Sequence, residues 1–280
     1  MTKNYANYLL LISVLISGSI LLQMIWYIYS LTSNFDIRFN LFQACQQLFK
    51  MFGVPFLEYI LLAFVAFTLL HLLWYCMIQI KKLHNLRTKI TGLTCSELSR
   101  EWNSRFQTNR IHVIQCEQPF AITVGFTKPQ IVLTTGLWDI LSDEEMESVI
   151  YHEFHHSYQF DPMKTFMMEL FAKVLWFLPI LKWLAQQFSI VREVLADNYA
   201  INKSGQRLHI SSALLKMINS KQVQHPASFV SFADGSINYR IQNMIEPNTS
   251  NKIKWPLVNS AASLSIFTLL SLVFSKLLHY

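Results

Sequence analysis

The sequence predicts a mainly α integral membrane protein that also carries a water-soluble α+β domain with a small antiparallel sheet. Charged residues make up only 14% of the chain and hydrophobic residues 52%, whereas a soluble domain usually carries about 25% charged residues. Three uncharged runs are long enough to cross a bilayer as helices, and a stretch of mixed composition separates the second from the third. The net charge of +6 is explained by lysines and arginines beside the spans, so no direct contact with nucleic acid is expected.

The first two uncharged runs predict a transmembrane hairpin within residues 1–80. Each has 22 residues, and roughly 20 helical residues cross the hydrocarbon core. Four cations follow the second run and place that end, and with it the N-terminus, in the cytoplasm. A third run of 20 residues predicts a C-terminal anchor within residues 251–280. The runs are Tyr8–Tyr29, Tyr59–Ile80 and Pro256–Ser275, and the cations are Lys81, Lys82, Arg87 and Lys89.

Residues 81–250 are expected to form a cytoplasmic domain, although residues 165–188 within it are strongly apolar. Glu169, Lys173 and Lys182 interrupt this segment, and Pro179 is expected to kink it. Each charged side chain would cost about 3 kcal/mol at the centre of a bilayer. A crossing here would also leave the two halves of the domain on opposite faces of the membrane. We therefore interpret the segment as one membrane-associated helix that lies in, or dips into, the cytoplasmic interface.

The remaining elements of the domain follow from local patterns. A polar helix is predicted over residues 96–107. Residues 111–116, 121–126 and 130–134 are short alternating stretches separated by glycine and proline, so they are expected to form the antiparallel sheet. Ser142 and Glu145 then make an S-x-x-E capping box, which predicts the start of a helix that ends before Asp161-Pro162.

That helix carries the pattern H-E-x-x-H in His152, Glu153 and His156. Residues four apart share one face of a helix, so the two imidazoles can converge on one metal ion. In this pattern the histidines bind zinc and the glutamate acts as general base toward water. A surface helix can carry the same residues by chance, but the capping box and the preceding sheet favour the zinc site.

Two histidines are too few, because catalytic zinc takes about three protein ligands and one water. The best source of a third is residues 189–202, a second helical stretch in which Glu193 and Asp197 are again four apart. Glu193 would complete the ligand set for one catalytic Zn²⁺, and Asp197 would accept the spare N–H of a ligand histidine. The alternative, an exposed acidic helix with Arg192 beside Glu193, would be preferred if the first motif were absent.

The sequence does not select the group that stabilises a developing oxyanion. Such a donor can contribute about 3–4 kcal/mol, and five side chains are candidates. They are Tyr158, Tyr199, His209, His225 and Arg240. The four cysteines stand singly, so no zinc knuckle or C-x-x-C redox site is expected.

Taken together, these motifs resemble the BlaR/MecR family of membrane zinc metallopeptidases, which act as antirepressors in β-lactam sensing. The resemblance rests on PFAITVGFTKPQIVLTTGLWDILSDEEMESVIYHEFHH, LWFLPILKWL, REVLADNYA and INYRIQNMI. It implies a gluzincin-like domain in which His152, His156 and Glu193 bind zinc, Glu153 is the base and Asp197 supports a ligand. It also implies that a substrate peptide pairs with an edge strand formed by Gln130, Ile131, Val132 and Leu133.

The resemblance further implies a multi-pass protein of the bacterial inner or plasma membrane whose peptidase domain faces the cytoplasm and cleaves a BlaI/MecI-like repressor. Sensor members carry an extracellular penicillin-binding domain after the last span, and this sequence ends at Tyr280, so acylation by β-lactams is not expected. The signal would enter through residues 31–57, a partner or the membrane. Two alternatives stay open: a quality-control peptidase of the HtpX type, and a zinc-binding scaffold or immunity protein without activity. The oligomeric state is also open, a homodimer included.

Overall fold

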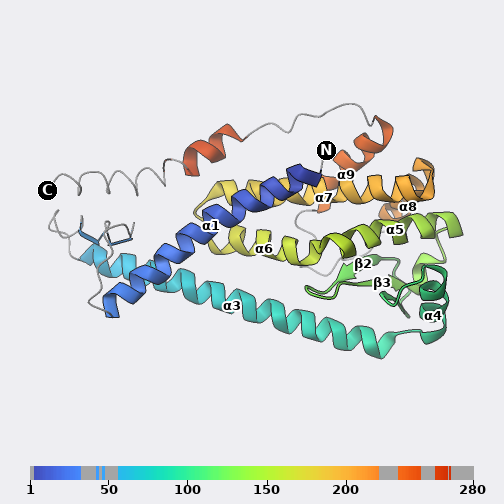
Figure 1. Ribbon diagram of the computed structural model, residues 1–280, viewed down its shortest axis with the longest axis horizontal. Helices are drawn as coiled ribbons and strands as arrows, with labels where there is room; N and C mark the ends of the chain where they lie inside the picture. The colour runs from blue at the N-terminus through green and yellow to red at the C-terminus, as the bar shows by residue number, and fades with distance from the viewer. Residues whose placement is uncertain are drawn as a thin grey trace. The chain divides into compact units, whose positions relative to one another are not determined.

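The computed structural model describes residues 3–32, 56–220, 233–246 and 256–263, together with residues 42, 43, 46, 47 and 265. The described part is mostly helical and includes a small sheet, as predicted (Figure 1). His225, most of residues 31–57 and most of the predicted third span lie outside the described residues. The long and short helices are α1 (Lys3–Thr32), α3 (Phe56–Leu93), α4 (Ser96–Arg105), α5 (Asp143–Gln159), α6 (Asp161–Val174), α7 (Pro179–Ser204), α8 (Arg207–Asn219) and α9 (Ala233–Ile245).

The chain divides into two compact units. The first, here called the long-helix unit, comprises Tyr8–Gln79, Met168–Ala185 and Ile253–Tyr280. The second, here called the sheet unit, comprises Met1–Asn7, Ile80–Met167 and Gln186–Lys252. The sheet unit therefore contains the whole of the H-E-x-x-H helix and the part of α7 that carries Glu193.

Two helices of the described part are long and apolar enough to cross a membrane, and they agree with the first two predicted spans. They cover Asn4–Leu31 of α1 and Tyr59–Leu93 of α3. Large apolar side chains point outward along both: Leu22 and Leu70 are each 65% exposed and Trp74 is 61% exposed. Apolar exposure on this scale marks a surface that something apolar covers, which supports association with a membrane.

The apolar segment of residues 165–188 is two helices rather than the single helix predicted. α6 ends at Val174, residues 175–178 turn, and α7 begins at Pro179. Proline is well suited to the first turn of a helix because the missing N–H would have had no partner there. The Lys173 ammonium group lies 3.8 Å from the Glu169 carboxylate and donates a hydrogen bond to the Tyr75 hydroxyl at 3.1 Å. The placement of this segment in the interface stays a prediction.

The sheet is mixed, which corrects the prediction of an antiparallel one. Its order is β1-β3-β2, so β3 (Gln130–Thr134) runs parallel to β1 (Ile111–Ile114) and antiparallel to β2 (Ala121–Val124). β2 and β3 form a hairpin that turns after Gly125, whose φ of 107° lies in the region that favours glycine. Alternation in the sequence locates each strand, but pairing order depends on tertiary contacts, which is why the prediction failed.

β3 is therefore the central strand, and the prediction that residues 130–133 form a substrate-binding edge is wrong. The outer side of β1 is covered by α4: the Val113 N–H donates to Ser99 Oγ at 2.9 Å, and the Ile111 N–H donates to Asn103 Oδ1 at 3.0 Å. The other edge of the sheet is β2.

The helix α5 lies along the sheet beside β2 and β3 (Figure 1). It begins at the predicted capping box: Glu145 N–H donates to Ser142 Oγ, and the Ser142 N–H donates to the Glu145 carboxylate. Ile150 and Phe154 on its inner face pack with Ile131 and Leu133 of β3 in one buried cluster. This packing fixes the rotation of α5, and so determines where the histidines on its opposite side point.

Candidate metal centre

The two histidines of α5 and Glu193 of α7 meet inside the sheet unit. Their potential ligand atoms all lie within 4.8 Å of one another. The Nε2 atoms of His152 and His156 are 3.1 Å apart, and the Glu193 carboxylate lies 3.4 Å from the first and 3.7 Å from the second. The spacing of four predicted a shared helix face for the two histidines, and the structure brings them together with Glu193.

These donor atoms fit a zinc ion. Bonds of about 2.0–2.1 Å in tetrahedral geometry separate neighbouring ligand atoms by about 3.3 Å. Here the two Nε2 atoms are 3.1 Å apart, Glu193 Oε2 lies 3.4 Å from the Nε2 of His152, and Glu193 Oε1 lies 3.7 Å from the Nε2 of His156. Two imidazoles and one carboxylate are also the donor set of one class of catalytic zinc sites. The side chains of His152 and His156 are 8% and 10% exposed, so they are held by the surrounding protein.

A carboxylate stands behind each of the two imidazoles. His152 Nδ1 lies 2.9 Å from Asp197 Oδ1, one helical turn after Glu193. His156 Nδ1 lies 2.7 Å from Asp161 Oδ2, at the start of α6. Each carboxylate occupies the Nδ1 side of a ring and leaves Nε2 facing the cluster. Sequence reasoning anticipated the position of Asp197 but assigned Asp161 only to the end of a helix.

Glu153 is buried next to the cluster, and a threonine that the sequence analysis missed holds it. Thr123 Oγ1 lies 2.7 Å from Glu153 Oε2 and 3.0 Å from the carbonyl oxygen of Glu153. Thr123 belongs to β2, so this hydrogen bond joins the edge strand to the carboxylate that follows His152. No signal in the sequence marks this threonine, because the contact joins segments 30 residues apart.

Positive charge surrounds the acidic side of the cluster. Arg240 of α9 donates to both oxygens of Asp197 at 2.8 Å and lies 3.5 Å from Glu193. Arg192 lies 3.0 Å from the other oxygen of Glu193 and also donates to the Thr165 hydroxyl. Burial alone would raise the pKa of Glu193, but the charges of His156 and Arg192 and hydrogen bonds from both histidines hold it well below its usual value.

The pKa of His156 is shifted upward, whereas that of Glu193 is shifted downward. Burial alone would lower the pKa of His156, but the Glu193 and Asp161 carboxylates raise it to about 10. The pKa of His152 is also raised: burial opposes the shift, and the Asp197 and Glu193 carboxylates outweigh it. A cluster without metal therefore favours a protonated His156 at neutral pH, and a cation that binds there must displace that proton.

The five oxyanion candidates are not equally placed. Arg240 enters the cluster, but its guanidinium is paired with Asp197. The Tyr199 ring centroid lies 5.6 Å from that of the half-buried His155. Tyr158 is 52% exposed and stacks on Phe154, while His209 lies on α8. His225 lies outside the described residues, so no structural position can be given for it.

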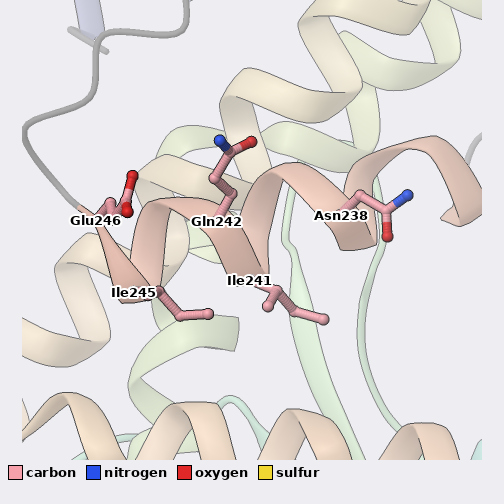
Figure 2. Close-up of a pocket in the computed structure, with 5 residues that line it drawn as sticks. All are labelled: Asn238, Ile241, Gln242, Ile245 and Glu246. Atoms are coloured by element: carbon pink, nitrogen blue, oxygen red, sulfur yellow. The ribbon is translucent and has the colours of Figure 1, made fainter.

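A shallow pocket on the outside of α9 is separate from this cluster. Figure 2 shows the residues that line it, all from α9 and the position after it: Asn238, Ile241, Gln242, Ile245 and Glu246. The two histidines and Glu193 are not among these lining residues. The pocket therefore adds nothing to the metal centre.

Comparisons with known proteins identify one family for this chain. The family model described as BlaR1 peptidase M56 matches residues 8–244. No curated protein matches the sequence. Among solved structures, the chain is similar to the Ste24p protein of S. mikatae, with 20% identity and a TM-score of 0.38. That alignment covers 66% of this chain and 60% of the Ste24p chain, so this chain spans less than two thirds of that protein's length.

Proposed function

This chain belongs to the BlaR1 peptidase M56 family, and we propose that it is a membrane-embedded zinc metalloendopeptidase for regulated proteolysis. The observation that carries the proposal is the convergence of His152, His156 and Glu193 with the Glu153 carboxylate beside them. We assign the first three as zinc ligands, Glu153 as the catalytic base, and Asp197 as the residue that orients His152.

The chemistry is hydrolysis of a peptide bond. A bound zinc ion would polarise the scissile carbonyl and lower the pKa of the attacking water. Glu153 takes a proton from that water and passes it to the leaving amine. Thr123 donates to one oxygen of Glu153, which leaves the other oxygen to accept the proton. Asp197 holds His152 with Nε2 toward the metal position, and Arg240 keeps Asp197 in place.

The outer side of β2 is the edge of the sheet on which we place the substrate. Along an antiparallel pair of strands, residues alternate between those whose backbone groups hydrogen-bond to the neighbouring strand and those whose backbone groups point away from it. The Thr134 N–H donates to the Phe120 carbonyl, so the backbone N–H and C=O groups of Phe120 point toward β3. By alternation, those of Ile122 also point toward β3, and those of Ala121 and Thr123 point away from it. An extended peptide can therefore pair with Ala121 and Thr123. Its backbone would then run beside the residue whose side chain holds Glu153.

For the substrate, we favour a cytosolic transcriptional repressor. Membership of the BlaR1 peptidase family supports this choice, and the four cations after the second predicted span support a cytoplasmic sheet unit. A quality-control peptidase would use the same site but would cut misfolded membrane proteins instead. Co-expression with a repressor encoded beside the gene separates the two, because only the first predicts a single cleavage in that repressor.

Replacement of Glu153 by Gln tests the assignment of the base. The variant should bind about one zinc per chain and lose chelator-sensitive cleavage, whereas His152→Ala should lose both. Glu147→Gln is the matched control, since Glu147 lies on the same helix and pairs with the exposed Arg105. Cleavage by Glu153→Gln at the wild-type rate would refute the role of Glu153. Zinc binding without any cleavage by the wild type would favour a non-catalytic scaffold.

A further inference from the structure

We propose that Asp161 is a positioning residue for the metal centre: it holds the proton on Nδ1 of His156 and so presents Nε2 to the metal. This inference rests on the proposed metal site but not on proteolysis. The Asp161 Oδ2 to His156 Nδ1 distance is 2.7 Å, and both side chains are buried. His156 Nε2 is the atom that faces His152 and Glu193.

A neutral imidazole carries its proton on one nitrogen and can coordinate a metal with the other. A carboxylate acceptor at Nδ1 selects the tautomer whose Nε2 lone pair is available. At His152, Asp197 Oδ1 lies 2.9 Å from Nδ1, and Asp197 is itself held by Arg240. Asp161 does it for His156 from a different helix, and in the described part of the chain its ion-pair contacts are only to His156 and, at 4.0 Å, His155.

The backbone at Phe160 brings Asp161 to this position. In a continuous helix, five residues advance the chain by about 140° beyond a full turn, so residue 161 would face away from His156. Instead α5 ends at Gln159, and Phe160 adopts the left-handed conformation, with φ 54° and ψ 37°. The Phe160 carbonyl then accepts from the N–H groups of Met163 and Lys164 at the start of α6. This turn interrupts the helix at one residue and changes the rotation of α6 relative to α5, so that Asp161 lies against the His156 ring.

That conformation is unfavourable for a residue with a Cβ, and glycine is the usual choice. The Phe160 side chain is 47% exposed, so burial of the ring does not explain why this position tolerates the strain. Strained backbone persists where the surrounding structure imposes it, and it gathers at functional sites. The feature that the turn secures here is the contact between Asp161 and His156.

The test is zinc affinity, measured on the detergent-purified full chain by competition with a chromophoric chelator. Asp161→Ala should bind zinc about 10–100-fold more weakly, the usual cost of losing an outer partner of a ligand. Asp161→Asn keeps an acceptor oxygen and should fall between. Asp143→Ala, on the exposed first turn of α5, should match the wild type. Wild-type affinity in Asp161→Ala would overturn the proposal.

A double-mutant cycle separates positioning from a general structural role. If Asp161 acts through His156, then Asp161→Ala should cause no further loss of zinc affinity in a His156→Cys background, which keeps a zinc ligand at this position and so a measurable affinity. An equal loss in both backgrounds would overturn the proposal. No outcome of these measurements depends on a substrate, so a protein that binds zinc as described but cleaves nothing would refute the proposed function alone.

Two variants at Phe160 test the turn while the side chains of Asp161 and His156 stay intact, and they apply even if Asp161→Ala does not fold. Phe160→Gly adopts the left-handed conformation readily and should keep wild-type zinc affinity. Phe160→Val, with its branched Cβ, disfavours that conformation and should weaken zinc binding severalfold. Equal affinity in these two variants would overturn the role of the turn.

Discussion

Replacement of Arg240 by Met should destabilise the sheet unit far more than loss of an ordinary ion pair. Arg240 is 12% exposed and Asp197 1% exposed, and two hydrogen bonds of 2.8 Å join them. Removal of one partner from a buried pair costs about 3–5 kcal/mol, because the other charge is left without compensation. The pKa of Arg240 supports this: burial would lower it, but the Asp197 and Glu193 carboxylates raise it above its usual value.

The assay is thermal unfolding of the detergent-purified protein, followed by tryptophan fluorescence. A loss of about 1 kcal/mol shifts the midpoint by about 2–4 °C in a unit of 150–250 residues, so the expected shift is about 6–20 °C. The control is Arg105→Met, which breaks the pair with Glu147 at side chains that are 46% and 34% exposed. An exposed pair contributes about 0–1 kcal/mol. The control should therefore shift the midpoint by only a few degrees.

Zinc adds a second comparison. A bound cation would replace part of the positive charge that Arg240→Met removes from Glu193 and Asp197. The destabilisation should accordingly be larger in the presence of a chelator than in the presence of zinc. If Arg240→Met lowers the midpoint no more than Arg105→Met under either condition, the ion pair does not hold the acidic side of the cluster, and the electrostatic reasoning is wrong.

Four more predictions concern contacts at the cluster and at the open edge of the sheet. Thr123→Val should lower kcat by about tenfold or more, which is the value of a hydrogen bond to a charged group, and should still bind zinc. Thr123→Ser keeps the hydroxyl and should retain most activity. Equal rates in the two variants would contradict the role of the hydroxyl. At pH 7, zinc binding should release a proton from His156, whose pKa is raised to about 10, and binding should strengthen as pH rises toward 10. Calorimetry in buffers of different ionisation enthalpy measures the proton release. Without metal, the stability that His156 contributes should be complete below its usual pKa of 6.5 and disappear as pH rises through about 10. Ala121→Pro removes a backbone N–H that points away from β3 and breaks no hydrogen bond to β3, so KM for a peptide substrate should rise. Ala121→Ser is the control and should leave KM unchanged. An unchanged KM in the proline variant would exclude pairing at this edge.

The parts of the site that the sequence predicted are those that helical spacing determines. His152 and His156 are four apart, as are Glu193 and Asp197, and a helix converts that spacing into a shared face wherever it lies. The capping box also located the start of α5 because the motif is local. The meeting of the two helices was an inference from the chemistry of zinc, and the structure brings the named side chains together.

The parts that escaped prediction depend on contacts between distant segments or on an unusual backbone. Alternation identified three strands but not that β3 would insert between the other two. Thr123 looks like any strand threonine until its hydroxyl meets Glu153. Asp161 could not be placed because a left-handed residue is normally inferred from glycine, and this position is Phe160. Arg240 was a candidate for a different role, and only the fold reveals that it pairs with Asp197.

The sheet unit is discontinuous in the chain, and this has a practical consequence for anyone who wishes to isolate it. Residues 168–185 are inserted between the histidines and Glu193, and α7 passes from one unit to the other without a break. Trimming the two ends of the polypeptide therefore cannot release a small water-soluble enzyme. A metal held by His152, His156 and Glu193 would act as a cross-link that closes a loop of chain around this insertion.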